Sequence, residues 1–186
     1  MKKIIFAVLF LSTGANQFAA QFSAGILYGP RTINDQEIKN AYGKGTVFFP
    51  YFQIDIVKGI ILGMGYEGGY ARTASLGLYH EKGTLDIEGY EIFVGYQLKI
   101  KSVSPYVKLG YNLFSYKQTI ASPFLEEFKV HHQKTAVSFG GGLKIFIMRF
   151  LYVSSEVRYV PLKVKPFDIE VDLGGFRFLG GIGFTL

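Results

Sequence analysis

Apolar and polar residues alternate with a period of two along most of the chain after residue 20. Such alternation places successive side chains on opposite faces of a β-strand. Turn-forming and polar clusters divide this part of the chain into eight segments, and no helical pattern of useful length occurs in it. The eight predicted strands are Gln21–Gly29, Thr46–Val57, Ile60–Tyr70, Ile87–Leu98, Pro105–Tyr116, Thr135–Phe146, Leu151–Pro161 and Gly174–Leu186.

The connections between these segments alternate between short and long. Short turns lie at Lys58-Gly59 and near Lys101 and Arg149. The long connections are Pro30–Gly45, Ala71–Asp86, Lys117–Lys134 and Leu162–Leu173. Transmembrane barrels have an even number of strands, with short turns at one rim and longer loops at the other. The sequence therefore predicts an all-β fold, an eight-stranded antiparallel up-and-down transmembrane β-barrel.

Each predicted strand has one bulky apolar face, which we assign to lipid, and one small or polar face, which we assign to the lumen. The apolar set is Phe48, Phe52, Ile54, Ile56, Leu62, Met64, Tyr66, Tyr90, Ile92, Val94, Tyr96, Leu98, Val107, Leu109, Tyr111, Leu113, Val137, Phe139, Leu143 and Ile145. The inward set is Gln53, Asp55, Gly63, Gly65, Glu67, Gly69, Glu91, Gly95, Gln97, Lys108, Gly110, Asn112, Ser138, Gly140, Gly142, Lys144, Glu156, Arg158, Arg177, Gly181 and Gly183. Glycines suit a narrow lumen, because eight strands leave only enough room for side chains to fill it. A soluble barrel, the alternative, would enclose the aromatic face instead.

The chain ends on a strand that runs to the terminal carboxylate. Gly181, Phe184 and Leu186 resemble the C-terminal signal of Gram-negative outer-membrane β-barrels, although Leu186 stands where that family prefers Phe. The resemblance implies a small monomeric barrel of the OmpA/OmpX type. Its expected partners are outer-membrane lipids including lipopolysaccharide, the barrel-assembly machinery and periplasmic chaperones, together with a surface ligand bound through the long loops.

Residues 1–20 have the pattern of a secretory signal peptide. Lys2 and Lys3 precede an apolar run and a small-residue stretch that ends at Ala20. The apolar run is shorter than the roughly 20 residues that a membrane-spanning helix needs. We expect cleavage after Ala20, with Ala15 as the alternative site, which leaves residues 21–186 as the barrel domain in the cell outer membrane.

Composition excludes several classes of function. The formal charge is +6, of which Lys2 and Lys3 in the leader contribute two. Four further bases, Lys58, Lys99, Lys101 and Arg149, fall at the short turns, where such side chains reach the membrane boundary, and the remaining charges nearly cancel. No basic face is left for nucleic acid. Without cysteine the chain has no disulfide and no thiolate chemistry. Its 13 Tyr and 18 Phe can form the aromatic girdles of a membrane barrel although Trp is absent.

The inward set contains acids and bases at similar heights. Glu67 and Glu91 lie on the third and fourth predicted strands, opposite the seventh and eighth strands of the closed barrel. We therefore expect a network across the lumen in which Glu67 and Glu91 pair with Arg158 and Arg177, and in which Glu156 is a further acceptor. Such a network would plug the lumen.

The three histidines, His80, His131 and His132, lie in predicted long loops. Some outer-membrane barrels modify lipid A with a serine and a histidine, a chemistry that also needs a carboxylate to orient the imidazole. The available set is His131 or His132 with Ser122 or Ser138 and Glu126 or Glu127. The His-x-Ser spacing of lipid-A deacylases is absent, so we predict no catalytic, metal or cofactor site.

The apolar stretch Ile120–Leu125 in the third long loop is open to two interpretations, a patch that binds a partner or an extension of the strands beyond the membrane. The sequence as a whole indicates a non-catalytic barrel with a structural or surface-interaction role. The alternatives are a lipid-A-modifying enzyme and a narrow passive channel for small solutes.

Overall fold

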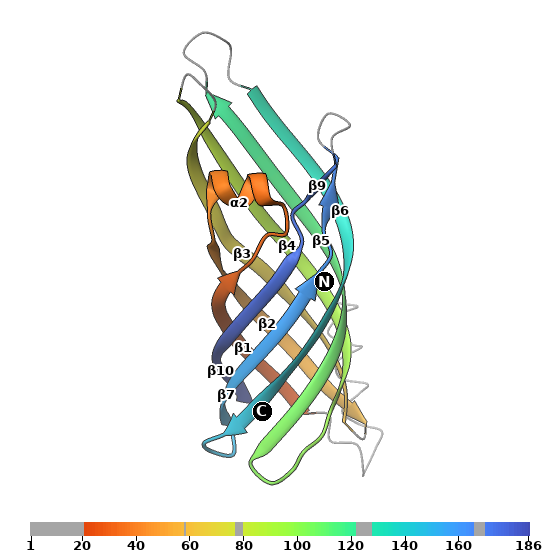
Figure 1. Cartoon of the computed structure of the whole chain (residues 1–186). Coiled ribbons are helices and arrows are strands. Elements are labelled where there is room, and N and C mark those ends of the chain that lie inside the picture. The colour runs from red at the N-terminus through yellow and green to blue at the C-terminus, as the bar shows by residue number, and fades with distance from the viewer. Residues whose placement is uncertain (1–20, 58, 77–79, 122–127, 166–169) are drawn as a thin grey trace, which may run out of the picture.

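The computed structural model describes residues 21–57, 59–76, 80–121, 128–165 and 170–186. In this part of the chain eight antiparallel strands close into a barrel (Figure 1). The barrel strands are β1 Gln21–Arg31, β2 Gly45–Val57, β3 Ile60–Leu76, β4 Glu81–Gln97, β5 Val103–Ala121, β6 Phe128–Phe146, β7 Leu151–Val160 and β10 Gly175–Thr185. Each strand pairs with its neighbour in the chain, and β10 pairs with β1 to complete the circle. The predicted fold class is confirmed. The expected signal peptide lies outside the described residues.

Three short elements lie in the long loops. Helix α2 (Gln36–Tyr42) begins at Asp35, whose carboxylate accepts the backbone N–H groups of Glu37 and Ile38, each at 3.0 Å. Strands β8 (Lys163–Val164) and β9 (Val171–Asp172) pair with each other between β7 and β10. The sequence did not predict α2, because seven residues are too few to show a helical period. Among the described residues, no helix is long and apolar enough to span a bilayer.

Four neighbouring strands are longer than predicted. Much of the expected loops 71–86 and 117–134 continues as strand: β3 and β4 lengthen to Leu76 and Glu81, and β5 and β6 to Ala121 and Phe128. Of the two interpretations of the third long loop, the described residues between 117 and 134 therefore show the extension of the strands. The outer parts of these strands (71–76, 81–87, 115–121 and 128–138) form what we call the raised sheet, which extends beyond α2 in Figure 1. The remainder of the Ile120–Leu125 stretch, from residue 122, lies outside the described residues.

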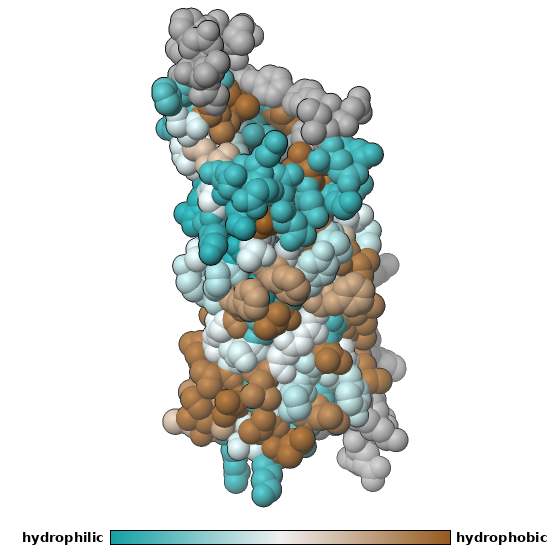
Figure 2. Space-filling model, viewed as in Figure 1, coloured by the Kyte–Doolittle hydropathy of each residue, from teal (hydrophilic) through white to brown (hydrophobic). Residues whose placement is uncertain are grey.

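An exposed apolar belt surrounds the barrel wall on the side of the short turns, and Figure 2 shows it in brown below a band of hydrophilic residues. The belt contains the outward side chains of the strands, such as Met64, Ile92, Val107 and Leu109, which are 45–62% exposed. Aromatic pairs mark its outer boundary, with ring centroids 5.2 Å apart for Tyr66–Tyr90 and 5.0 Å apart for Tyr159–Phe176. A belt with an aromatic girdle is the outer surface of a transmembrane barrel.

The inward assignment of Gly69 was wrong. The pairing of β3 with β4 shifts between Glu67 and Tyr70, and Gly69 has a φ of 90° at this β-bulge. The extra residue reverses the alternation, so that Gly68 and Tyr70 are buried and Gly69 is exposed.

The belt predicts a sharp dependence on depth. Leu109→Arg, in the belt on β5, should lower the free energy of unfolding by about 2–4 kcal/mol, whereas Gln133→Arg, in the raised sheet on β6, should lower it by less than about 1 kcal/mol. Reversible urea unfolding in lipid vesicles measures both. Equal losses for the two variants would contradict the position of the belt.

Closure of the barrel depends on the last residues of the chain. The Leu186 N–H donates to the Phe22 carbonyl at 2.8 Å, and the Phe22 N–H donates to the Leu186 carbonyl at 3.3 Å. Gly181 is required for close approach, because a Cβ there would collide with the Ile26 carbonyl. Phe184 and Leu186 point outward from the barrel.

Deletion of Phe184–Leu186 should block assembly. The loss exposes backbone groups of β1 to lipid, and each such group costs several kcal/mol. Leu186→Phe, the matched control, should preserve or improve assembly. Membrane fractionation with heat-modifiable gel mobility measures both, and a normal level of folded truncated protein would show that the terminal residues are dispensable.

Candidate functional site

Side chains fill the described lumen in three layers. Next to the short turns lies a layer of three tyrosines around Lys144, and the middle layer is charged. The charged layer consists of Arg31, Glu67, Glu91, Lys108, Glu156, Arg158 and Arg177, each no more than 6% exposed. The outer layer is apolar and closes the lumen on the side of the long loops.

Glu67 on β3 anchors one half of the charged layer. Arg177 on β10 donates to Glu67 through Nη2 at 3.1 Å and through Nε at 3.3 Å. Arg31, the last residue of β1, donates to the same carboxylate at 3.2 Å. Both arginines also bind backbone carbonyls, Arg31 that of Leu173 and Arg177 that of Gly175. These contacts join the barrel wall to the segment that enters β10.

Glu91 and Glu156 form the other half with Lys108 and Arg158. Lys108 Nζ lies 3.2 Å from a Glu91 oxygen and 3.0 Å from a Glu156 oxygen. Arg158 Nε donates to Glu156 at 2.8 Å, and its Nη1 lies 3.2 Å from Glu91. This half therefore forms a closed ring of alternating charges.

Neutral groups complete the coordination of these two carboxylates. The Ser138 hydroxyl donates to Glu91 at 2.6 Å, and the Tyr106 hydroxyl donates to Glu156 at 2.8 Å. The Arg158 guanidinium stacks on the Phe49 ring at 3.8 Å, and this contact stabilises its Nη1 and Nη2 atoms, neither of which makes a hydrogen bond to a described residue. Burial of charge is tolerated here because the ions are paired and hydrogen-bonded.

All five residues of the expected network lie in this layer. Glu67 contacts Arg177, and Glu91 contacts Arg158, whereas the approach of Arg158 to Glu67 is longer, at 3.9 Å. Sequence reasoning missed Arg31, because it follows Pro30 in what was expected to be a loop. The sequence placed Lys108 inward but did not include it in the network. In the structure Lys108 lies between Glu91 on β4 and Glu156 on β7 and forms an ion pair with both.

The layer below contains a lysine without an ion pair among the described residues. Lys144 Nζ lies 5.1–6.0 Å from the ring centroids of Tyr51, Tyr106 and Tyr152. The hydroxyls of Tyr51 and Tyr152 are 2.9 Å apart and share a hydrogen bond. Aromatic faces stabilise the ammonium by cation–π attraction.

The outer layer is formed partly by the long loops. Tyr42 of α2 and Leu162, Val164 and Leu173 around β8 and β9 are at most 5% exposed and belong to one apolar cluster with the lumen side chains. Gln118 of β5 donates to the Tyr42 hydroxyl at 2.9 Å, which holds α2 against the wall. The loops therefore cover the charged layer.

The histidines do not form the considered hydrolase site with Ser138, which donates to Glu91 inside the lumen. His131 Nε2 instead lies 3.0 Å from Ser115 Oγ on the outer face. The nearby carboxylate of Glu88 accepts from Tyr66 and Lys117. Ser122, Glu126 and Glu127 lie outside the described residues. Within the described ranges, no cluster of three or more His, Cys, Asp or Glu side chains could hold a metal ion.

Comparison with known proteins places the chain in a family. The family model described as outer membrane protein beta-barrel domain matches residues 4–181. The chain belongs to this family. It is therefore a small β-barrel of the Gram-negative outer membrane, with the short turns on the periplasmic side and the long loops at the cell surface. No curated protein sequence matches it.

Solved structures share the fold at low sequence identity. OprG from Pseudomonas aeruginosa is 12% identical with a TM-score of 0.65, and the match covers 91% of this chain and 97% of OprG. The N-terminal barrel domain of OprF from the same organism is 15% identical with a TM-score of 0.57, covering 91% and 100%. Ail from Yersinia pestis is 16% identical with a TM-score of 0.55, covering 90% and 99%.

The charged layer generates a double-mutant test. Arg158→Ala should lower the free energy of unfolding by about 3–5 kcal/mol, because it leaves Glu91 and Glu156 with one cation between them. Glu91→Gln in the same protein should recover about 1 kcal/mol or more relative to the sum of the single changes. Lys163→Gln, in an exposed loop, is the control and should be additive with Arg158→Ala. If the losses in unfolding free energy from Arg158→Ala and Glu91→Gln were additive in reversible unfolding, the network would be contradicted.

Proposed function

We propose that the protein is a non-catalytic outer-membrane barrel with a closed lumen that acts through its raised sheet at the cell surface. The observation that carries this proposal is the free edge of β6. Pairing of β6 with β7 begins at Phe139 and Tyr159, but β6 starts at Phe128. No backbone hydrogen bond joins residues 131–138 to β7 or to a loop within the described chain.

Strand register identifies the backbone groups at this edge. The Phe146 N–H donates to Ser102 of β5, and the β5–β6 pairing is regular from there to Phe128. In an antiparallel ladder both backbone groups of a residue point to the same neighbour, and successive residues alternate. The even-numbered residues of β6 therefore bond to β5. From residue 131 on, the odd-numbered residues direct their N–H and C=O groups to the free edge: His131, Gln133, Thr135 and Val137.

A free edge of this kind binds an extended polypeptide by adding a strand to the sheet. The equivalent edge on the opposite side of the raised sheet, at β3, is partly covered because α2 packs beside it. The polar outward side chains at the β6 edge, including His131 and Gln133, keep it soluble and exposed. The filled lumen favours this role over a solute channel. The expected ligand is thus an extended segment of a surface or secreted protein.

In-cell cross-linking tests the proposal. A photo-reactive amino acid at Gln133 should give a discrete protein adduct, whereas the same group at Leu109 in the apolar belt should give lipid adducts. Thr135→Pro removes an N–H from the free edge and should abolish the protein adduct with unchanged heat-modifiable mobility.

Lys134→Pro is the matched control, because its N–H points to β5 and its loss should destabilise the barrel itself. Adducts at Gln133 that persist in Thr135→Pro, or the absence of any protein adduct, would contradict strand addition at this edge.

A further inference from the structure

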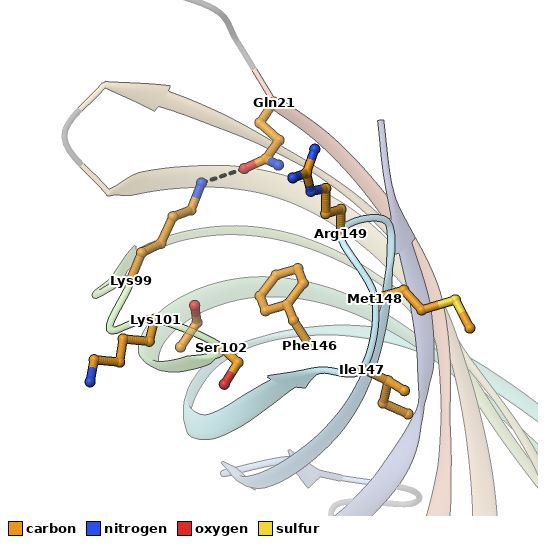
Figure 3. Close-up of a pocket in the computed structure, with 9 residues that line it drawn as sticks. Gln21, Lys99, Lys101, Ser102, Phe146, Ile147, Met148 and Arg149 are labelled. Carbon is orange, nitrogen blue, oxygen red and sulfur yellow. Dashed lines mark hydrogen bonds between the residues drawn. The ribbon is translucent and has the colours of Figure 1, made fainter.

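A pocket of about 540 Å³ opens at the periplasmic mouth, on the opposite side of the barrel from the raised sheet. It lies between the turns that join β4 to β5 and β6 to β7, and the start of β1 forms its remaining wall. Figure 3 shows Lys99, Lys101 and Arg149 around this pocket, with Met148 and Ile147 on the outer side of the turn. The network and the proposed function do not use the pocket.

The rim of the pocket has an excess of positive charge. Lys99 lies 2.7 Å from Asp55 and also donates to Gln21. Neither Lys101 nor Arg149 has an acidic side chain within 4 Å among the described residues. Asp55 is therefore already paired with Lys99, whereas Lys101 and Arg149 make no ion pair among the described residues.

The wall of the pocket contains a buried donor without a partner. Ser104 lines the pocket and is 1% exposed, yet its hydroxyl makes no hydrogen bond to any residue that the structure describes. Buried hydroxyls are rarely left unpaired. Ser104 is paired in register with Lys144 on β6. An unpaired hydroxyl and an ammonium that has no ion pair in the described part of the chain are thus register neighbours behind the cationic rim.

We propose that this pocket binds a phosphate-class oxyanion. Lys101 and Arg149 supply charge at the mouth, and Ser102 and Ser104 supply hydroxyl donors along the wall. Charge-assisted hydrogen bonds of this kind are the strong ones for phosphate. The alternative is that these basic residues only reach the membrane boundary. In that case their side chains would lie on the lipid side, and the buried, unpaired Ser104 hydroxyl would have no explanation.

Two sources can supply the phosphate. One is a soluble phosphate in the periplasm, and the other is the headgroup of an inner-leaflet phospholipid. The second is compatible with Ile147 and Met148, which are 62% and 53% exposed beside the pocket and would contact the acyl chains.

Binding to the purified, folded protein distinguishes the sources. Calorimetry in a zwitterionic detergent measures inorganic phosphate, and native mass spectrometry measures phosphatidylglycerol retained against phosphatidylcholine. We expect the affinity for whichever ligand binds to fall by about tenfold or more in Ser104→Ala. The same loss is expected in the double variant Lys101→Gln with Arg149→Gln. Lys117→Gln on the outer surface should have no effect.

Binding of inorganic phosphate identifies the soluble source, and retention of phosphatidylglycerol without phosphate binding identifies the lipid. Either result supports the site if Ser104→Ala weakens the binding and leaves the heat-modifiable mobility of the protein unchanged. Absence of both kinds of binding, or binding that is indifferent to Ser104→Ala, would overturn the proposal, since nonspecific charge attraction does not involve a buried hydroxyl.

Discussion

The circumference of the barrel is the constraint on which the rest of this structure depends. Eight strands enclose a space that side chains alone can fill, so each inward residue packs against others from across the lumen. A charge placed there is buried from solvent, so it is stable only where other inward side chains pair with it or surround it. The contacts of Glu67 with Arg177 and of Glu91 with Lys108 and Arg158 follow from this requirement.

The charged layer also organises the surface of the molecule. Arg31 and Arg177 bind Glu67 and at the same time bind the carbonyls of Leu173 and Gly175, so the segment entering β10 is fixed above the lumen. The loops on this side fold inward as an apolar cover. The outer parts of β3 to β6 pack their inward side chains against that cover and continue beyond it as the raised sheet, whose β6 edge has no backbone partner among the described residues.

The sequence predicted the parts of the fold in which one face meets lipid and the other meets the lumen, because only there does the period of two appear. This contrast is missing at residues 131–134, which are exposed on both faces of β6, and so the segment was assigned to a loop. Gly69 was assigned to the wrong face because a bulge adds a residue without changing the local pattern.

The charged site was predictable to a similar degree. Glu67, Glu91, Arg158 and Arg177 could be placed from strand position alone. Arg31 could not, because Pro30 suggested that the strand had already ended, whereas Pro30 lies within β1 and pairs with Thr46. The shared position of Lys108 depends on the stagger between strands, which the sequence does not specify. Alternation finds the inward face, and geometry is needed to find the partners.

Conductance of the purified protein in planar lipid bilayers tests the central claim most directly, because the claim is that paired charges and the loop cover close the lumen. The account predicts no steady open-pore current from the wild-type protein. A large, steady conductance from correctly folded, heat-modifiable protein would contradict it and would make a solute channel the better description.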